Sequence, residues 1–212
     1  MKGFVSGRVV FTDLDGTLLD AITYRADGAI AALEMLEEKG IPLIFCSSKT
    51  RAEVNHLREW LGNRHPFIVE NGGGIFVPGG YFSRPVGESV DGFERVTLGL
   101  PYREVRARFV ELRERVGIAV RGFGDMDDAE VAERTGLSLE SAHRARMRDF
   151  EEPFVFMEGE SAEFLCAVEE GGLHWTRGRL FHLMGDHDKG KAVVMVKRFF
   201  GAEGTGLRSI GL

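Results

Sequence analysis

The sequence predicts an α/β protein, a Rossmann-like parallel-sheet core with an inserted α+β cap domain. Three observations lead to this prediction. Strand-like and helix-like segments alternate over residues 1–80, which is typical of a parallel sheet. The regular alternation of strand and helix stops over residues 81–184, where strand-like segments and charged helix-like segments follow one another in no fixed order. The alternation resumes over residues 185–212, so we expect the middle segment to be inserted between two parts of the core domain.

Each expected element of residues 1–80 has a local signal. Apolar runs predict strands, and apolar residues at helical spacing predict helices. Thr50 and Glu53 have the spacing of a capping box, so a helix is expected to begin after Thr50 and to end near Gly62. In chain order we expect strand Val9–Phe11, helix Ala26–Lys39, strand Pro42–Cys46, the capped helix, strand Phe67–Val69 and a return strand Ile75–Val77.

The inserted segment is expected to hold mixed elements of its own. They are strand Phe93–Leu98, helix Tyr102–Arg115, strand Ile118–Phe123, helices Asp127–Arg134 and Ser138–Met147, strand Phe154–Met157, helix Ser161–Glu169 and strand Arg179–Met184. After it, a helix that begins at Lys189 and a strand at Leu207–Leu212 return to the strand and helix pattern of the core.

The composition excludes several classes of partner. A net charge of −6 argues against nucleic acid. No apolar stretch reaches the ~20 residues needed to span a bilayer, and no leader precedes the first strand. We therefore expect a cytoplasmic enzyme that does not bind membranes. Cys46 and Cys166 are isolated in apolar segments, which predicts buried free thiols.

The most informative motif follows the first expected strand. Asp13 and Asp15 place two carboxylates at the exit of a buried strand, where unpaired charges are costly. A hard divalent cation such as Mg²⁺ removes their repulsion and lets a phosphate approach. Gly16 permits a tight turn close to a ligand, and Thr17 offers a hydroxyl or an N-cap. An acidic turn without a ligand is the alternative interpretation.

Three later segments are expected at the same edge of the sheet, because open α/β sheets bind ligands outside the carboxyl ends of their strands. Ser47 and Ser48 precede a helix N-terminus, which suits phosphate, although they could serve as a plain N-cap. Lys189 offers a cation before another helix, whereas Lys191 fits a solvated loop better. Asn71 either orients the substrate or shapes its turn, and the glycines after it indicate close backbone approach or unusual φ.

These motifs resemble those of the haloacid dehalogenase-like phosphohydrolases. In that family the first Asp of the Asp-x-Asp-x-Thr signature attacks phosphorus and the second moves a proton. The resemblance therefore implies that Asp13 is the nucleophile, that Asp15 is the general acid and base, and that both hold Mg²⁺. It also implies that Ser47 and Lys189 occupy the second and third motifs and hold the phosphoryl oxygens.

Longer segments narrow the resemblance. The turn at residues 70–73 resembles the Cof-like branch, and residues 46–50, 149–154 and 178–185 resemble mannosyl-3-phosphoglycerate phosphatases. That family implies Mg²⁺-dependent hydrolysis of a small phosphorylated sugar-acid, mannosyl-3-phosphoglycerate, to mannosylglycerate and phosphate. The residues implied in substrate binding are Ser48, Lys49, Asn71, Gly72, Arg177 and Arg179.

Other interpretations stay open at this point. A surface salt bridge explains Arg177 or Arg179 as well as ligand contact does. His182 is expected to be a structural histidine, and His187 could support Lys189. Another Cof-like sugar phosphatase or a phosphomutase is the alternative enzyme. The sequence makes no prediction of oligomeric state.

The resemblance also implies a fourth, acidic motif that completes the Mg²⁺ shell. It is expected directly after the strand that Leu207–Leu212 resembles, and no residue follows Leu212. We favour a reading frame that continues beyond Leu212 over a naturally short protein. On that expectation, a catalytically inactive fragment is the alternative to an active enzyme.

Overall fold

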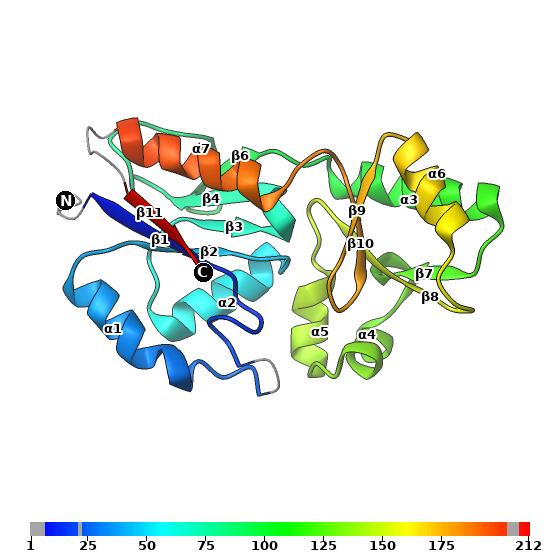
Figure 1. The fold of residues 1–212 in the computed structure, drawn as a ribbon, viewed down its shortest axis with the longest axis horizontal. Helices are drawn as coiled ribbons and strands as arrows, with labels where there is room; N and C mark the ends of the chain where they lie inside the picture. The colour runs from blue at the N-terminus through cyan, green and yellow to red at the C-terminus, as the bar shows by residue number, and fades with distance from the viewer. Residues whose placement is uncertain (1–6, 21–22, 203–207) are drawn as a thin grey trace.

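The computed structural model describes residues 7–20, 23–202 and 208–212. Its helices and strands form two domains side by side, each built around its own sheet (Figure 1). We call the domain with the seven-stranded sheet the core and the domain with the four-stranded sheet the cap. Among the described residues, no helix is long and apolar enough to cross a membrane.

The core sheet is parallel around its centre and antiparallel toward one edge. Strand β1 pairs in parallel with β2 on one side and with β11 on the other, and β2 pairs in parallel with β3. The return strand β4 is antiparallel to β3, as the sequence predicted. In sheet order the strands are β11 (Arg208–Gly211), β1 (Arg8–Thr12), β2 (Leu43–Cys46), β3 (Phe67–Val69), β4 (Gly74–Pro78), β6 (Phe93–Thr97) and β5 (Glu88–Val90).

Helices cover both faces of this sheet, which is why its central strands are apolar throughout. Alternate residues of β1 face opposite ways: Val10 packs on the side of α1 and α2, and Val9 and Phe11 pack on the side of α7. Helix α7 therefore lies alone on one face of the sheet and α1 and α2 on the other (Figure 1). The helices are η1 (Asp27–Ala29), α1 (Ile30–Glu38), α2 (Arg51–Leu61), η2 (Glu70–Gly72) and α7 (Lys189–Ala202).

The capping box predicted for α2 is confirmed. The Thr50 side chain accepts a hydrogen bond from the Glu53 N–H, and the Glu53 carboxylate accepts one from the Thr50 N–H. The helix ends at Gly62, whose φ of 67° is the left-handed conformation that a C-terminal glycine supplies. These local contacts fix where the chain turns after Ser47 and Ser48.

The cap has an antiparallel sheet with two helices on one face and two at its side. Phe109 and Phe164, from α3 and α6, pack on Phe154 and Phe181 of the sheet. A smaller apolar cluster joins α4 and α5. The elements are α3 (Tyr102–Val116), β7 (Val120–Gly122), η3 (Phe123–Asp125), α4 (Asp128–Thr135), α5 (Leu139–Arg146), β8 (Glu152–Phe156), α6 (Ala162–Glu170), β9 (His174–Arg177) and β10 (Phe181–Met184).

The structure corrects two expectations and adds two strands, β5 and β9. Phe93–Thr97 does not join the inserted unit, because it pairs with β4 and extends the core sheet. We therefore propose that the cap begins near Pro101, rather than at residue 81, and ends at residue 184. Cys166 is exposed, since it lies on the solvent side of α6, whereas Cys46 is buried as predicted. Strand β9 had no clear apolar signal because its residues are exposed or half-buried.

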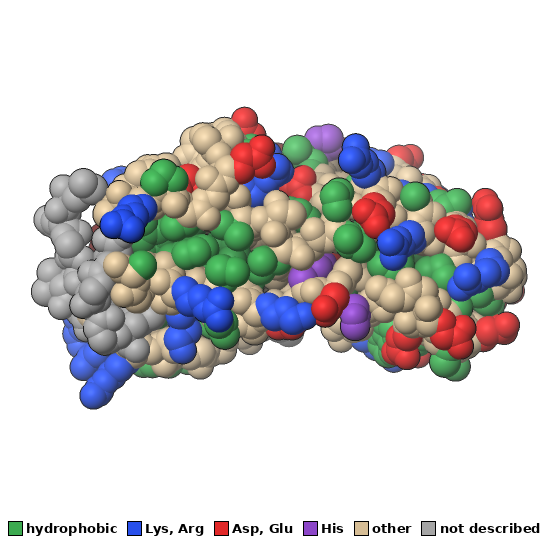
Figure 2. Space-filling model, turned by 90° about the horizontal axis from the view of Figure 1, so that it is seen from above, with side chains coloured by type: hydrophobic (Ala, Val, Ile, Leu, Met, Phe, Trp, Pro, Cys, Tyr) green, Lys and Arg blue, Asp and Glu red, His purple; other side chains and the backbone are tan. Residues whose placement is uncertain are grey.

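The surface also differs between the domains. Seen from above, hydrophobic side chains gather over the core, and acidic side chains are most frequent toward the end of the cap that is remote from it (Figure 2). Val194 of α7 is one of the exposed hydrophobic residues of the core.

Candidate active site

A cleft of about 1210 Å³ lies between the two domains, at the carboxyl ends of β1, β2 and β3. It brings together most of the residues singled out by their motifs. Those that line it are Asp13, Asp15, Ser48, Lys49, Asn71, Arg177, Arg179 and Lys189. Ser47 and Gly72 do not line it, because both are buried beneath its floor.

Asp13 is held by two donors at the end of β1. Its Oδ1 accepts a hydrogen bond of 2.7 Å from the Leu14 N–H. Its Oδ2 lies 2.6 Å from Nζ of Lys189, the first residue of α7. The Asp13 side chain is still 41% exposed, so one face of the carboxylate is open to a ligand. The pair places a cation beside a carboxylate that remains accessible.

Asp15 has a lysine partner of its own. Its Oδ2 lies 3.0 Å from Nζ of Lys49, which also lies 5.6 Å from the centre of the Tyr24 ring. Lys49 follows β2, so the first two strands each bring one member of this ion pair. Sequence reasoning missed Tyr24, which carries no recognisable motif and is brought to the cleft by the loop after β1.

The serines after β2 have different environments. Ser47 is 1% exposed, and its Oγ accepts a hydrogen bond of 3.2 Å from the Lys49 N–H. Ser48 lines the cleft, and its carbonyl accepts a bond from Arg148 of the cap. The hydroxyl of Ser47 therefore shapes the turn under the cleft, while Ser48 faces the cleft itself.

The glycine turn after β3 confirms the expectation of close backbone approach. Gly72 has a φ of 100°, and a Cβ there would lie 2.3 Å from the carbonyl oxygen of Asp188. A Cβ at Gly73 would lie 2.5 Å from the Cβ of Phe150. Because Asp188 directly precedes Lys189, this contact sets the start of α7 and hence the position of the lysine.

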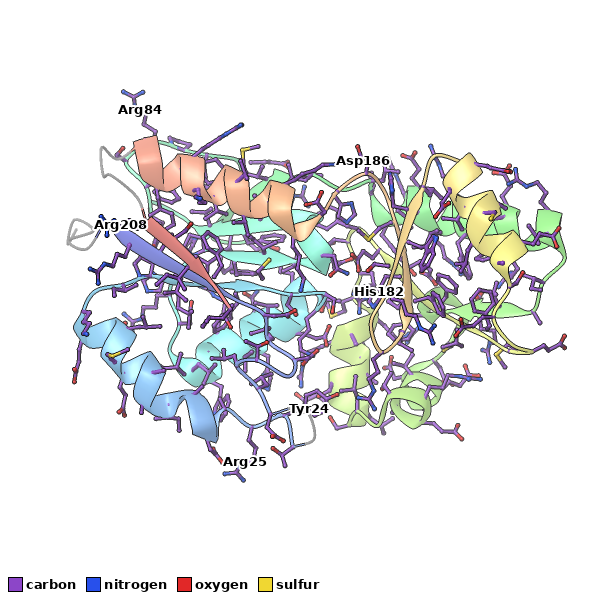
Figure 3. All side chains as sticks on the ribbon, in the orientation of Figure 1. Tyr24, Arg25, Arg84, His182, Asp186 and Arg208 are labelled. Carbon is purple, nitrogen blue, oxygen red and sulfur yellow. The ribbon has the colours of Figure 1, made fainter. Side chains whose placement is uncertain are left out.

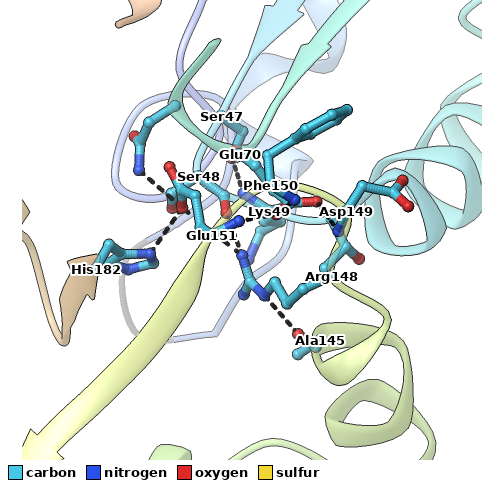
Figure 4. A network of polar contacts seen from close by, with 12 residues as sticks. Ser47, Ser48, Lys49, Glu70, Ala145, Arg148, Asp149, Phe150, Glu151 and His182 are labelled. Carbon is cyan, nitrogen blue, oxygen red and sulfur yellow. Dashed lines mark hydrogen bonds and ion pairs between the residues drawn. The ribbon is translucent and has the colours of Figure 1, made fainter. Parts of the chain in front are cut away.

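Glu70 fastens the cap to this turn (Figure 4). Its Oε1 accepts a hydrogen bond from the Asp149 N–H, and its Oε2 accepts bonds from the N–H groups of Phe150 and Glu151, all at 2.8–2.9 Å. Burial raises the pKa of Glu70 to about 8, despite these donors and the nearby charge of Arg148. Sequence reasoning assigned no role to Glu70, since its partners lie about 80 residues away.

We call this contact between the cap segment 149–151 and the core turn after β3 the junction. Glu151 is a second carboxylate buried at the junction. Burial alone would raise its pKa, but the hydrogen bond with His182, the nearby His187 and the charge of Arg148 hold the pKa at about 2. Its Oε2 lies 2.9 Å from Nδ1 of His182 and 3.3 Å from Nδ2 of Asn71. The carboxylate thus joins a cap strand to the turn that follows β3.

The cap wall of the cleft is basic. Among the described residues, the cap side chains that line it include no Asp or Glu and five basic groups: Arg134, Arg148, Arg177, Arg179 and His182. Arg179 contacts the Tyr24 hydroxyl, and Arg177 pairs at the surface with Glu160 at 2.7 Å. Arg134 was not foreseen, because a basic residue in the last turn of a helix also suits the helix dipole.

The donor set at β1 fits a hard divalent cation. Asp13 and Asp15 offer half-exposed carboxylate oxygens, which are the ligands that Mg²⁺ prefers. Within the described ranges no third Asp, Glu, His or Cys joins them in a cluster. Mg²⁺ commonly keeps several waters and takes only one or two protein carboxylates beside a substrate phosphate, so the accessible Asp13 carboxylate with the neighbouring Asp15 suffices for a fit.

Comparisons with known proteins agree with this geometry. Residues 10–82 match a family model described as haloacid dehalogenase-like hydrolase. A glucosyl-3-phosphoglycerate/mannosyl-3-phosphoglycerate phosphatase of Methanococcoides burtonii is 41% identical over 96% of this chain and 77% of its own length. A protein of the same name from Persephonella marina is 40% identical over 91% of this chain and 72% of its own length.

Solved structures show the same fold. A protein of Thermoplasma acidophilum superposes with a TM-score of 0.68 at 20% identity, over 96% of this chain and 76% of that one. A haloalkanoate-superfamily phosphatase from Bacteroides thetaiotaomicron gives 0.63 at 18% identity, over 97% of this chain and 78% of that one.

Proposed function

The chain belongs to the haloacid dehalogenase-like hydrolases and is a phosphoric monoester hydrolase, and from this premise we propose that it cleaves mannosyl-3-phosphoglycerate to mannosylglycerate and phosphate. One observation carries the substrate choice: a cleft whose core wall holds two paired carboxylates and whose cap wall is basic. A sugar-acid phosphate has a phosphate for the first wall and a carboxylate for the second.

Asp13 attacks phosphorus in this proposal. A new bond forms between a carboxylate oxygen and phosphorus, the bond to the sugar-acid oxygen breaks, and an aspartyl-phosphate results. Lys189, at 2.6 Å from Asp13, offsets the negative charge that gathers as phosphate meets carboxylate. The accessible face of the Asp13 carboxylate supports this role.

Asp15 moves the protons. It protonates the departing sugar-acid oxygen in the first step, and it then takes a proton from the water that attacks the aspartyl-phosphate. The Lys49 partner at 3.0 Å orients the carboxylate toward the cleft. Water adds to phosphorus, the bond from Asp13 breaks, and phosphate leaves with the enzyme restored.

The floor of the cleft completes the phosphate site. The Ser47 turn and the N-terminus of α2 supply backbone N–H groups, and Ser48 supplies a hydroxyl. The side chain of Asp13 and the carbonyl of Asp15 would hold Mg²⁺, which when bound neutralises phosphate charge. The cap contributes Arg134 and Arg179 for the acid group.

The test is phosphate release with Mg²⁺ from mannosyl-3-phosphoglycerate, glucosyl-3-phosphoglycerate and mannose 6-phosphate. We expect kcat/KM to favour the sugar-acid esters over mannose 6-phosphate by about 10- to 100-fold, which corresponds to roughly 1.4–3 kcal/mol of transition-state binding. Equal kcat/KM for all three esters would contradict the assignment and leave a general sugar phosphatase.

A further inference from the structure

The buried carboxylate of Glu151 holds two side chains that line the cleft. Its Oε2 accepts a hydrogen bond from Nδ2 of Asn71, in the core, at 3.3 Å and lies 2.9 Å from Nδ1 of His182, in the cap. Both partners line the cleft, whereas Glu151 is 0% exposed and does not reach it. Glu151 can therefore act on a ligand only through neighbouring side chains that line the cleft.

Two further basic side chains approach Glu151 on its other sides. The guanidinium of Arg148 lies 4.0 Å from Oε2, and Nε2 of His187 lies 3.7 Å from Oε1. Oε1 itself makes no hydrogen bond within the part of the chain that the structure describes. Because these neighbours keep Glu151 ionised, its Oε2 is an acceptor, and the nitrogen of His182 that faces it must carry hydrogen.

The position of His182 follows from its strand. It lies on β10 between β8 and β9, opposite Pro153 and Thr176. This strand runs along the side of the cap that faces the core (Figure 3). With Nδ1 committed to Glu151, Nε2 is the ring atom that remains for a ligand in the cleft.

We propose that His182 is a specificity-determining residue whose Nε2–H donates a hydrogen bond to the carboxylate of the leaving sugar-acid, and that Glu151 is the positioning residue that orients it. This inference rests on the proposed function, since it adds a group that reads the acid to Arg134 and Arg179. Both ring nitrogens then carry hydrogen and each donates to a carboxylate, one of the protein and one of the substrate.

His187 is the matched control. It also approaches Glu151, but its side chain is 0% exposed, and its Nε2–H donates to the carbonyl of Glu70 at 3.2 Å. It does not line the cleft. A histidine beside the same carboxylate but away from the ligand separates recognition from general support of the junction.

The experiment compares two esters that differ only in the acid group: mannosyl-3-phosphoglycerate and the mannosylglycerol phosphate in which CH₂OH replaces the carboxylate. The readout is the ratio of their kcat/KM values, with thermal unfolding recorded for each variant. We expect His182→Leu to lower this ratio by about 10-fold, mainly through KM for the acid, because one charge-assisted hydrogen bond is lost.

A conservative variant and the control variant test whether the change in this ratio comes from acid recognition by His182. His182→Gln keeps a polar donor near the place of Nε2, so the ratio should fall by only about threefold. His187→Gln should leave the ratio within twofold of wild type, even where it lowers the unfolding temperature. Adding Glu151→Gln to His182→Leu should lower the ratio no further than His182→Leu alone, because Glu151 acts through His182.

Failure of the proposed function and failure of this inference about His182 give different results. If wild type shows no preference between the two esters, the proposed function and this inference both fall. If wild type prefers the acid and His182→Leu keeps the full preference, only the inference falls. Equal loss for both esters in His182→Leu, with the ratio unchanged, would also overturn it by assigning His182 a structural role.

Discussion

The two walls of the cleft are built from different kinds of contact. On the core wall each acidic side chain of the motif has a lysine partner, Lys189 for Asp13 and Lys49 for Asp15. On the cap wall Arg179 contacts a hydroxyl, Arg177 pairs with a surface glutamate, and Arg134 contacts the sulfur of Met157 at 3.8 Å. Two further basic groups of this wall, Arg148 and His182, approach the buried Glu151. The core wall carries groups of both signs, with acidic groups in excess, whereas basic groups are in excess on the cap wall.

This difference assigns the phosphoryl-transfer reaction to the core wall and the selection among substrates to the cap wall in the proposed function. In the proposed function the carboxylates and ammonium groups of the core wall act on the phosphoryl group and the oxygen that leaves it, so they serve any phosphate ester that enters. A basic wall distinguishes esters by the charge of the rest of the molecule. Changes on the core wall should therefore slow all substrates alike, and changes on the cap wall should alter the ratio between substrates.

Asp13→Asn gives the largest expected effect. The amide keeps the shape of the side chain but cannot form the aspartyl-phosphate, so kcat should fall at least about a thousandfold for every phosphoester. Phosphate release measured on a sugar-acid ester and on p-nitrophenyl phosphate checks this. A variant that keeps more than a tenth of the rate would exclude Asp13 as the nucleophile.

Lys189→Met tests the cation of the core wall. Removing the ammonium that lies 2.6 Å from Asp13 should lower kcat/KM by about 100-fold for both esters, since the transferring phosphate loses a charged partner. Lys191→Met is the control, because Lys191 pairs with Asp186 at the surface. We expect it to stay within twofold of wild type. Similar losses in the two variants would mean that general charge, rather than this position, is what matters.

Arg134→Ala tests the cap wall. The kcat/KM for mannosyl-3-phosphoglycerate should fall by about tenfold, whereas hydrolysis of p-nitrophenyl phosphate should change less than twofold. Arg177→Ala serves as the comparison, since Arg177 already pairs with Glu160 at the surface and should lose less. An equal loss on both esters in Arg134→Ala would remove the division between the two walls.

Glu70→Gln tests the junction between the two walls. Of these variants, it has the smallest expected effect, and that effect is on stability. Glu70 accepts three backbone hydrogen bonds, and an amide must turn a donor toward one of those N–H groups. We expect a loss of about 1–2 kcal/mol in the free energy of unfolding at pH 5. Urea denaturation followed by circular dichroism measures it.

The pH dependence of that loss has a defined sign. The pKa of Glu70 is raised in the folded protein to about 8, so the folded state binds a proton that the unfolded chain releases above its ordinary value of 4.5. This contribution to stability is complete below pH 4.5 and disappears as the pH rises to about 8. The difference between wild type and Glu70→Gln should therefore shrink from pH 5 to pH 8.5, and a difference that stays constant would show that Glu70 is ionised throughout this range.

Sequence reasoning worked best where the signal is local. The capping box at Thr50 and Glu53 and the carboxylate pair after β1 lie within a few residues of each other, so their geometry follows from backbone conformation. Strand Phe93–Thr97 was recognised as a strand but placed in the wrong sheet, because a strand pattern does not specify its neighbour.

The contacts between cap and core at the junction could not be predicted, because local sequence does not specify partners that are distant in the chain. Glu70 bonds to amides 79–81 residues away, and Arg148 bonds to a carbonyl 100 residues away. Buried carboxylates are rare, and their sequence neighbourhood does not say which donors will satisfy them. Only the packing of cap against core reveals Glu151 behind His182.

The contact between Asp13 and Lys189 joins residues that are 176 positions apart, and this separation has a consequence for synthesis. At ~5–20 residues per second, the ribosome releases Lys189 roughly 10–35 s after Asp13. During that interval the nascent chain carries Asp13 without its ammonium partner. Parallel pairing of β1 with β11 also waits for residues 208–211. Catalytic competence is therefore acquired late in translation, after the whole cap has emerged.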